Sequence, residues 1–131
     1  VRRQPGTVVD ESEIYDYDEQ HPIPDPSVID IHGMRKGGGS DLVIVVASPL
    51  EANERSLRRL LRKLEVYLTF VKSDQYQEES GPPSPDNTRI VVKIHRGSSP
   101  EAFELLYRNT AWVRNNDASL EIDACFPEKQ N

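Results

Sequence analysis

Apolar and polar residues alternate in several short stretches of the chain. Residues 28–32, 89–95 and 118–126 place apolar side chains at every second position, which is typical of strands with one buried face. Residues 42–47 are apolar throughout, as expected for a central strand covered on both faces. Glycines at positions 33 and 37–39 predict a hairpin turn between the first two strands. The pattern therefore predicts four β-strands.

Two further segments repeat their apolar residues every three or four positions, as amphipathic helices do. The first opens with Ser-Pro-Leu-Glu at positions 48–51, a capping serine, a proline at the first helical position and a glutamate three residues on. Its leucine stripe predicts a helix to about residue 72. Ser99 and Pro100 repeat the capping signature for a second helix. Residues 74–87 are rich in helix breakers and predict a long mobile loop.

The order of these elements, ββαβαβ, predicts an α+β fold. Crossovers between parallel strands are right-handed, so both helices are expected on one face of a mixed four-stranded sheet, as a two-layer α/β sandwich. Residues 1–26 lack either period and place proline at positions 22, 24 and 26, which predicts an acidic, proline-rich extension and linker. The predicted organisation is this extension, one domain at residues 27–126, and a tail at 127–131.

The net charge of −6 is concentrated in the predicted extension, which holds seven acidic and two basic residues. The nearly neutral remainder argues against nucleic-acid binding, which needs excess Lys and Arg to replace phosphate counterions. The longest apolar run, residues 42–47, is too short to cross a membrane, and no signal peptide is visible, so we expect no membrane partner. Cys125 is the only cysteine, which favours a reducing, cytoplasmic location.

Four core patterns of the chain resemble a small bacterial domain family of unknown function. The resemblance spans about residues 27–123 and omits the extension. It implies the α+β fold and a bacterial source, and it implies no activity, because its signature consists mostly of core residues. The patterns are Ser27-Val28-Ile29-Asp30, Asp41-Leu42-Val43-Ile44-Val45, Leu60-x-x-Lys63-Leu64-x-x-Tyr67-Leu68-x-Phe70-Val71 and Arg89-Ile90-Val91-Val92-Lys93-Ile94.

The sheet face away from the helices is expected to collect polar side chains that include the ligand types of zinc. No short-spaced pair such as His-x-x-x-His or Cys-x-x-Cys is present, so a solvated sheet face explains them better, and we expect neither a cofactor nor catalytic residues. The weak metal candidates are His32, His95 and Asp123. The residues expected on this face are Asp30, His32, Lys93, His95, Glu121, Asp123 and Cys125.

A strip of basic residues lies opposite the leucines of the first predicted helix, at Arg55, Arg58, Arg59, Arg62 and Lys63. Such a strip suits phosphate, an acidic partner or the acidic extension of this chain. We hypothesise that residues 15–19 of the extension lie across it; the alternatives are a solvated helix face and a disordered tail. The predicted partner-binding residues are Tyr15, Asp16, Tyr17, Asp18, Glu19, Arg55, Arg58, Arg59 and Arg62.

These observations favour a non-enzymatic bacterial module that binds another protein, as an immunity or antitoxin-like partner does. An inhibitor of a basic nuclease would use Asp16, Asp18 and Glu19 in place of phosphates. One alternative is a small-molecule or metal-dependent enzyme that uses the open sheet face around His32, His95 and Asp123. Another is a structural homodimer with two open sheet faces packed together, which would bury Val28, Val43, Val45 and Val91.

Overall fold

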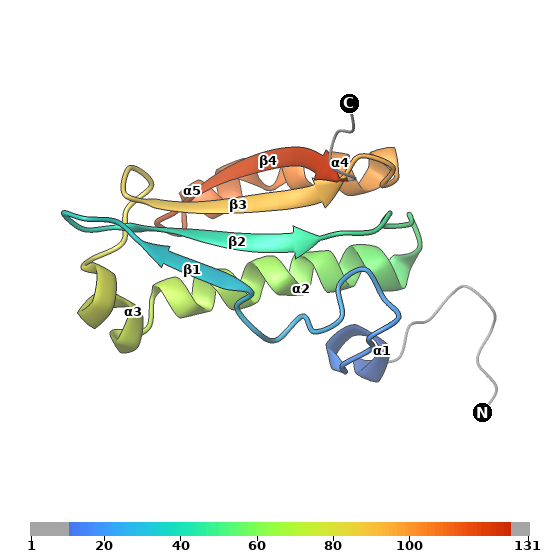
Figure 1. The fold of residues 1–131 in the computed structure, drawn as a ribbon, viewed down its shortest axis with the longest axis horizontal. Helices are drawn as coiled ribbons and strands as arrows, with labels where there is room; N and C mark the ends of the chain where they lie inside the picture. The colour runs from blue at the N-terminus through green and yellow to red at the C-terminus, as the bar shows by residue number, and fades with distance from the viewer. Residues whose placement is uncertain (1–10, 127–131) are drawn as a thin grey trace.

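The computed structural model describes residues 11–126 and contains a four-stranded mixed sheet. The strands lie side by side in the order β1-β2-β3-β4, with β1 antiparallel to β2 and the other pairs parallel (Figure 1). The strands are β1 (Ile31–Met34), β2 (Ser40–Val46), β3 (Thr88–His95) and β4 (Ser119–Phe126). The α+β class and the mixed four-stranded sheet are as predicted.

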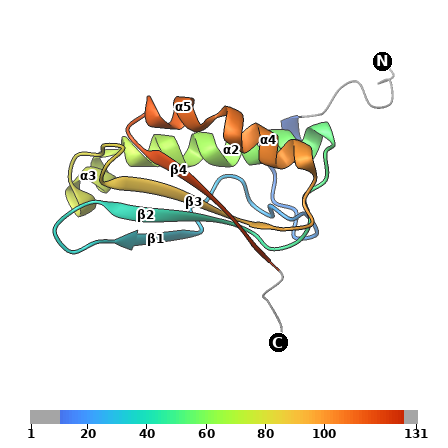
Figure 2. The same cartoon turned by 90° about the horizontal axis from the view of Figure 1, so that it is seen from above.

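The helices are more numerous than the sequence predicts. Figure 2 shows α2, α4 and α5 along one side of the sheet, so three helices cover that face where two were expected. The order ββαβαβ therefore omits α1, α3 and α5. The helices are α1 (Glu11–Tyr15), α2 (Glu54–Val71), α3 (Asp74–Ser80), α4 (Pro100–Arg108) and α5 (Thr110–Arg114). Over the described residues, no helix has the length and apolar character needed to span a membrane.

The core lies between the sheet and α2, and it follows from the two periodicities of the sequence. Burial alternates along β2 and, except at the buried Val91, along β3, so the even-numbered residues of these strands face the helices. The leucine stripe of α2 packs onto them, as its three- to four-residue spacing requires. The main buried residues of these elements are Leu42, Ile44, Val46, Leu60, Leu64, Leu68, Val71, Ile90, Val92 and Ile94.

Helix α2 begins five residues later than the Ser-Pro-Leu-Glu signature predicts. Its N-cap is Asn53, whose side chain accepts a hydrogen bond from the Ser56 amide at 2.8 Å. Residues 48–51 cannot start the helix because Leu50 is fixed in the core, where its amide donates to Ser98 Oγ and its carbonyl accepts from the Ser99 amide. By contrast, Ser99 caps α4 as predicted, with Pro100 in its first turn.

Residues 74–87 are not the featureless loop that their breakers predict. Ser73 caps α3, and Tyr76 of this helix is fully buried. The Tyr76 hydroxyl lies 2.6 Å from Ser40 Oγ and 3.0 Å from Thr88 Oγ1, at the first residues of β2 and β3. The segment therefore anchors the ends of two parallel strands.

Strand β1 covers only part of the edge of β2, and side chains form hydrogen bonds with the rest of that edge. The predicted strand at residues 28–32 is observed at Ile31–Met34, and Val28 lies before the sheet. At the last β1 pairing, the Tyr67 hydroxyl donates to the Val43 carbonyl, and beyond it the Asp30 carboxylate accepts from the Val45 amide. Lys63 of α2 is 2% exposed and fixes this arrangement through the carbonyls of residues 25 and 28 and through Asp30 Oδ1.

We expect Lys63→Met to lower the free energy of unfolding by about 2–4 kcal/mol, because three oxygen acceptors lose their common charged donor inside the protein. Urea unfolding followed by circular dichroism measures this loss. The control is Arg58→Met on the same helix, where an exposed ion pair with Glu54 predicts a change of about 0.5 kcal/mol or less. Equal losses in the two variants would contradict a structural role for Lys63.

Candidate functional site

Residues 12–26, called the arm below, lie against α2 (Figure 1). They contact the face of the helix that carries its arginines. The two isoleucines of the arm are buried: Ile14 is 3% exposed and Ile23 is 1% exposed, and Ile23 belongs to the main core. The arm is therefore part of the domain, and the predicted domain start at residue 27 is too late. Residues 1–10 of the predicted extension and the predicted tail at 127–131 lie outside the described residues.

Arg59 holds the arm by its backbone carbonyls. Its side chain is 0% exposed, and its guanidinium donates hydrogen bonds to backbone carbonyls along the arm. Burial is the main cause that lowers the pKa of Arg59, and the positive charge of Arg55 lowers it further. The accepting carbonyls belong to Glu13 (2.9 Å), Ile14 (3.4 Å), Asp16 (2.9 Å), Ile23 (2.6 and 3.1 Å) and Pro24 (3.0 Å).

Arg55, one turn before Arg59, adds the main charge pair between arm and helix. Its Nε donates to the Glu13 carbonyl at 3.0 Å, and its Nη2 lies 2.5 Å from Asp18 Oδ2. The Arg55 hydrogen bond, followed by a bond from the Gln20 amide, lowers the pKa of Asp18. The Asp18 carboxylate is thus turned inward, and both of its oxygens have partners within the molecule.

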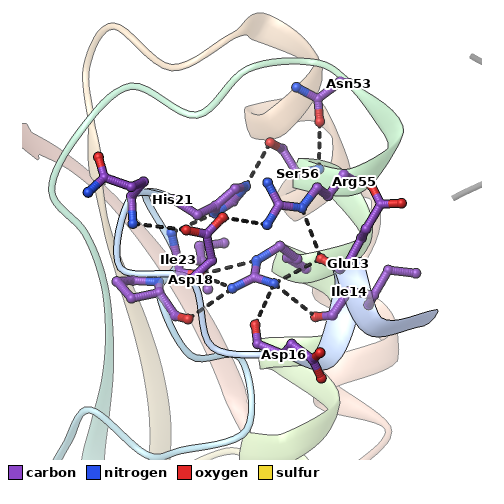
Figure 3. A network of polar contacts seen from close by, with 12 residues as sticks. Glu13, Ile14, Asp16, Asp18, His21, Ile23, Asn53, Arg55 and Ser56 are labelled. Carbon is purple, nitrogen blue, oxygen red and sulfur yellow. Dashed lines mark hydrogen bonds and ion pairs between the residues drawn. The ribbon is translucent and has the colours of Figure 1, made fainter. Parts of the chain in front are cut away.

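His21 is a buried neutral base at the junction of the arm with the start of α2 (Figure 3). Its Nδ1 accepts from the Ile23 amide at 2.9 Å, so the ring proton belongs on Nε2, which lies 2.9 Å from Ser56 Oγ. Burial, followed by the nearby charges of Arg59 and Arg55, lowers the pKa of His21 to about 4. The imidazole is therefore uncharged at neutral pH.

These contacts agree with the hypothesis that residues 15–19 lie across the basic strip. Opposite charges are only part of the contact, because Arg59 binds backbone carbonyls of the arm and not its carboxylates. The Tyr15 ring lies 5.0 Å from the guanidinium carbon of Arg62, as a cation–π contact requires. Four of the five predicted cations contact the arm, namely Arg55, Arg59, Arg62 and, at the Asp25 carbonyl, Lys63. Arg58 instead pairs with Glu54 on its own helix, and Lys63 binds residues 25–30.

The other face of the arm points to solvent. Tyr17 is 66% exposed and Tyr15 is 42% exposed, and the side chains of Asp16 and Glu19 are exposed beside them. The arm thus combines an anchored inner face with an acidic, aromatic outer face, defined by Tyr15, Asp16, Tyr17 and Glu19.

The structure separates the weak metal candidates. His32 pairs in register with Leu42 and therefore faces the helices, where its ring packs against Phe70 and Tyr76; its predicted place on the open face is wrong. His95 Nδ1 accepts from the Gly97 amide, and Asp123 lies 3.8 Å from Lys93 Nζ. Within residues 11–126, no three His, Cys, Asp or Glu side chains gather as a metal site requires.

Asp30 is also misplaced by the prediction. Its carboxylate binds Lys63 of α2 and the edge of β2, so it does not lie on the open face. The alternation of the neighbouring strands places Lys93 and Glu121 on that face as expected, at the register positions beside Val45 and Val91. The positions of His32 and Asp30 differ from the prediction for one reason: β1 begins at Ile31 and not at residue 28.

An open hollow of the described surface lies away from the arm, along α4. It has a volume of about 700 Å³ and a mostly apolar wall that includes Tyr107, 62% exposed. Such an open apolar hollow suits contact with another molecule better than it suits chemistry. Its walls are formed by Arg96, Ser98, Pro100, Phe103, Glu104, Tyr107 and Arg108.

Comparison with known proteins found no relative of this chain. No family model, no curated protein and no solved structure matches the chain. The resemblance to a bacterial domain family therefore stays a prediction, and the geometry of the described residues carries the functional argument.

We expect Arg59→Met to release the arm while the sheet stays folded, because at least four backbone carbonyls lose their only shared charged donor. Amide hydrogen exchange of residues 13–24 should accelerate, and the free energy of unfolding should fall by about 3 kcal/mol. Arg58→Met is the matched control and should leave exchange in the arm unchanged. Full protection of the arm in Arg59→Met would contradict its anchoring role.

The protein should lose stability as the pH falls from about 6.5 to about 4. His21 has a pKa of about 4 when folded and an ordinary value of 6.5, so the unfolded chain binds more protons in this window. The full loss amounts to about 3 kcal/mol. His21→Asn can still accept from the Ile23 amide and does not titrate, so its urea midpoint should change less over this window. Parallel pH profiles of the two proteins would refute this assignment.

Proposed function

We propose that the protein is a non-enzymatic module that recognises a basic surface of another protein through the outer face of the arm. The observation that carries this proposal is the arrangement of the arm itself. Its inner face is fixed by Arg59, and its outer face presents Tyr15, Asp16, Tyr17 and Glu19 to solvent.

Anchoring supports this proposal because an ordered segment loses little further conformational entropy when it binds. The backbone around Tyr17 is fixed on both sides, by Arg59 at the Asp16 carbonyl and by Arg55 at the Asp18 carboxylate. Exposed tyrosines frequently carry much of the binding energy of protein interfaces. The adjacent carboxylates of Asp16 and Glu19 favour a partner surface of opposite charge.

We further propose an immunity or antitoxin-like role, in which the partner is a basic bacterial toxin such as a nuclease. Such a role needs binding without turnover, which fits the separation of His32, His95 and Asp123 in the structure. The acidic contacts differ from those expected from the sequence. Asp18 is occupied by Arg55, so Asp16 and Glu19 are left to replace phosphate groups.

The test compares two triple variants of the intact protein. The arm variant, Asp16→Asn/Tyr17→Ala/Glu19→Gln, should lose a partner that copurifies with the wild-type protein in native mass spectrometry. With that partner purified, calorimetry should show binding weakened by at least about tenfold, and wild-type affinity should fall as salt rises.

The matched control lies on α4, where Glu101→Gln/Glu104→Gln/Tyr107→Ala also removes two exposed acids and an exposed tyrosine. This variant should retain the partner at wild-type affinity. Loss of the partner from the α4 variant alone would place the contact at the α4 hollow and would reject the proposed arm surface.

A further inference from the structure

The sheet has one long open edge, at β4. Strand β4 has eight residues, and within residues 11–126 it pairs only with β3. Figure 2 looks onto this strand and shows no described element across its outer edge. The opposite edge differs, because β1 has four residues and the Tyr67 and Asp30 side chains cover β2 at and beyond the last β1 pairing. An open edge presents unpaired backbone donors and acceptors to any extended segment.

On the open face of the sheet, charge changes sign from one strand to the next. Arg35, directly after β1, lies 2.5 Å from Asp41 of β2. Arg89 of β3 donates to Asp41 at 3.1 Å and, on its other side, to Glu121 of β4 at 2.8 Å. The order of signs is therefore basic, acidic, basic and acidic, and it ends on the acidic strand at the open edge.

A second pair of side chains on the same face repeats the contact between a basic residue of β3 and an acidic residue of β4. Lys93 of β3 lies 3.8 Å from Asp123 of β4, with which it pairs in register. The Glu121 and Asp123 side chains remain 49% and 41% exposed, so each can accept a further donor. Continuation of the alternation requires basic side chains on the next strand, because opposite charges on neighbouring strands attract.

The other face of β4 determines which side chains an added strand needs on its helix-facing side. Leu120 and Ile122 point toward the helices and are half-buried against the core. A strand added beside them needs apolar side chains on that face to extend the packing. A second copy of β4 does not fit, because its own Glu121 and Asp123 would be brought beside those of the first copy.

We propose that the outer edge of β4 binds an extended segment of another protein in which basic and apolar residues alternate, as a fifth strand of the sheet. The basic residues lie beside Glu121 and Asp123, and the apolar residues lie beside Leu120 and Ile122. Backbone hydrogen bonds hold the segment, and the side chains select it. This surface is separate from the arm and goes beyond the proposed arm function.

The test titrates three kinds of capped eight-residue peptide into the isotope-labelled intact protein. A peptide of alternating lysine and valine should shift the amide resonances of residues 119–124. A glutamate and valine peptide should bind about tenfold more weakly or not at all. Two N-methylated lysine and valine peptides, methylated at every lysine or at every valine, block one hydrogen-bonding edge each, so at least one should lose binding.

Variants of the protein separate this surface from the arm. Glu121→Gln/Asp123→Asn keeps the shape of β4 and should bind the lysine and valine peptide about tenfold more weakly. The arm variant of the previous section should bind it as the wild type does. The proposal is overturned if the glutamate peptide binds as tightly, if both methylated peptides bind unchanged, or if the shifts lie outside β4.

Discussion

The burial of two cations on one side of α2 is the constraint on which the rest of the structure depends. Arg59 and Lys63 are one turn apart, are 0% and 2% exposed, and need oxygen acceptors to replace the water they have lost. Residues 13–30 supply these acceptors, and nearly all are backbone carbonyls. The chain before the sheet therefore has to curve around α2 so that its carbonyls converge on two side chains. The late start of β1 and the capping of the β2 edge by Asp30 follow from this path.

Most of the sheet and one helix start could be predicted because their signals are local. Strands β2, β3 and β4 are identified by alternation or by continuous apolar residues, and α4 is identified by Ser99 and Pro100. The start of α2 was misplaced because two capping signals compete, and a distant contact from Ser98 to Leu50 decides between them. Helix α3 was missed because one buried tyrosine, Tyr76, replaces the apolar stripe that would predict it.

Only those contacts of the site that involve charged side chains could be predicted from the sequence. An acidic segment and a basic helix face indicate contact, and Asp18 with Arg55 and Tyr15 with Arg62 provide it. The central contact of Arg59 has no sequence signal, since every residue of the arm offers the same carbonyl group. His32 was placed on the wrong face because a strand beginning at residue 31 pairs it with Leu42, and no local pattern fixes that register.

The reliance of Arg59 on carbonyl groups also bears on how this protein can evolve. A hydrogen bond to a backbone oxygen does not depend directly on the side chain of the residue that offers it, so substitutions at Asp16 keep this bond, while they remove a negative charge that favours the Arg59 cation. The Tyr17 side chain is directed to solvent, so the contacts that hold the arm to α2 do not depend on it. Selection can therefore rewrite the outward residues of the arm one at a time while the domain keeps its stability. Under the proposed function, the exposed residues of the arm can change together with a partner surface while the contacts that hold the arm to α2 are kept.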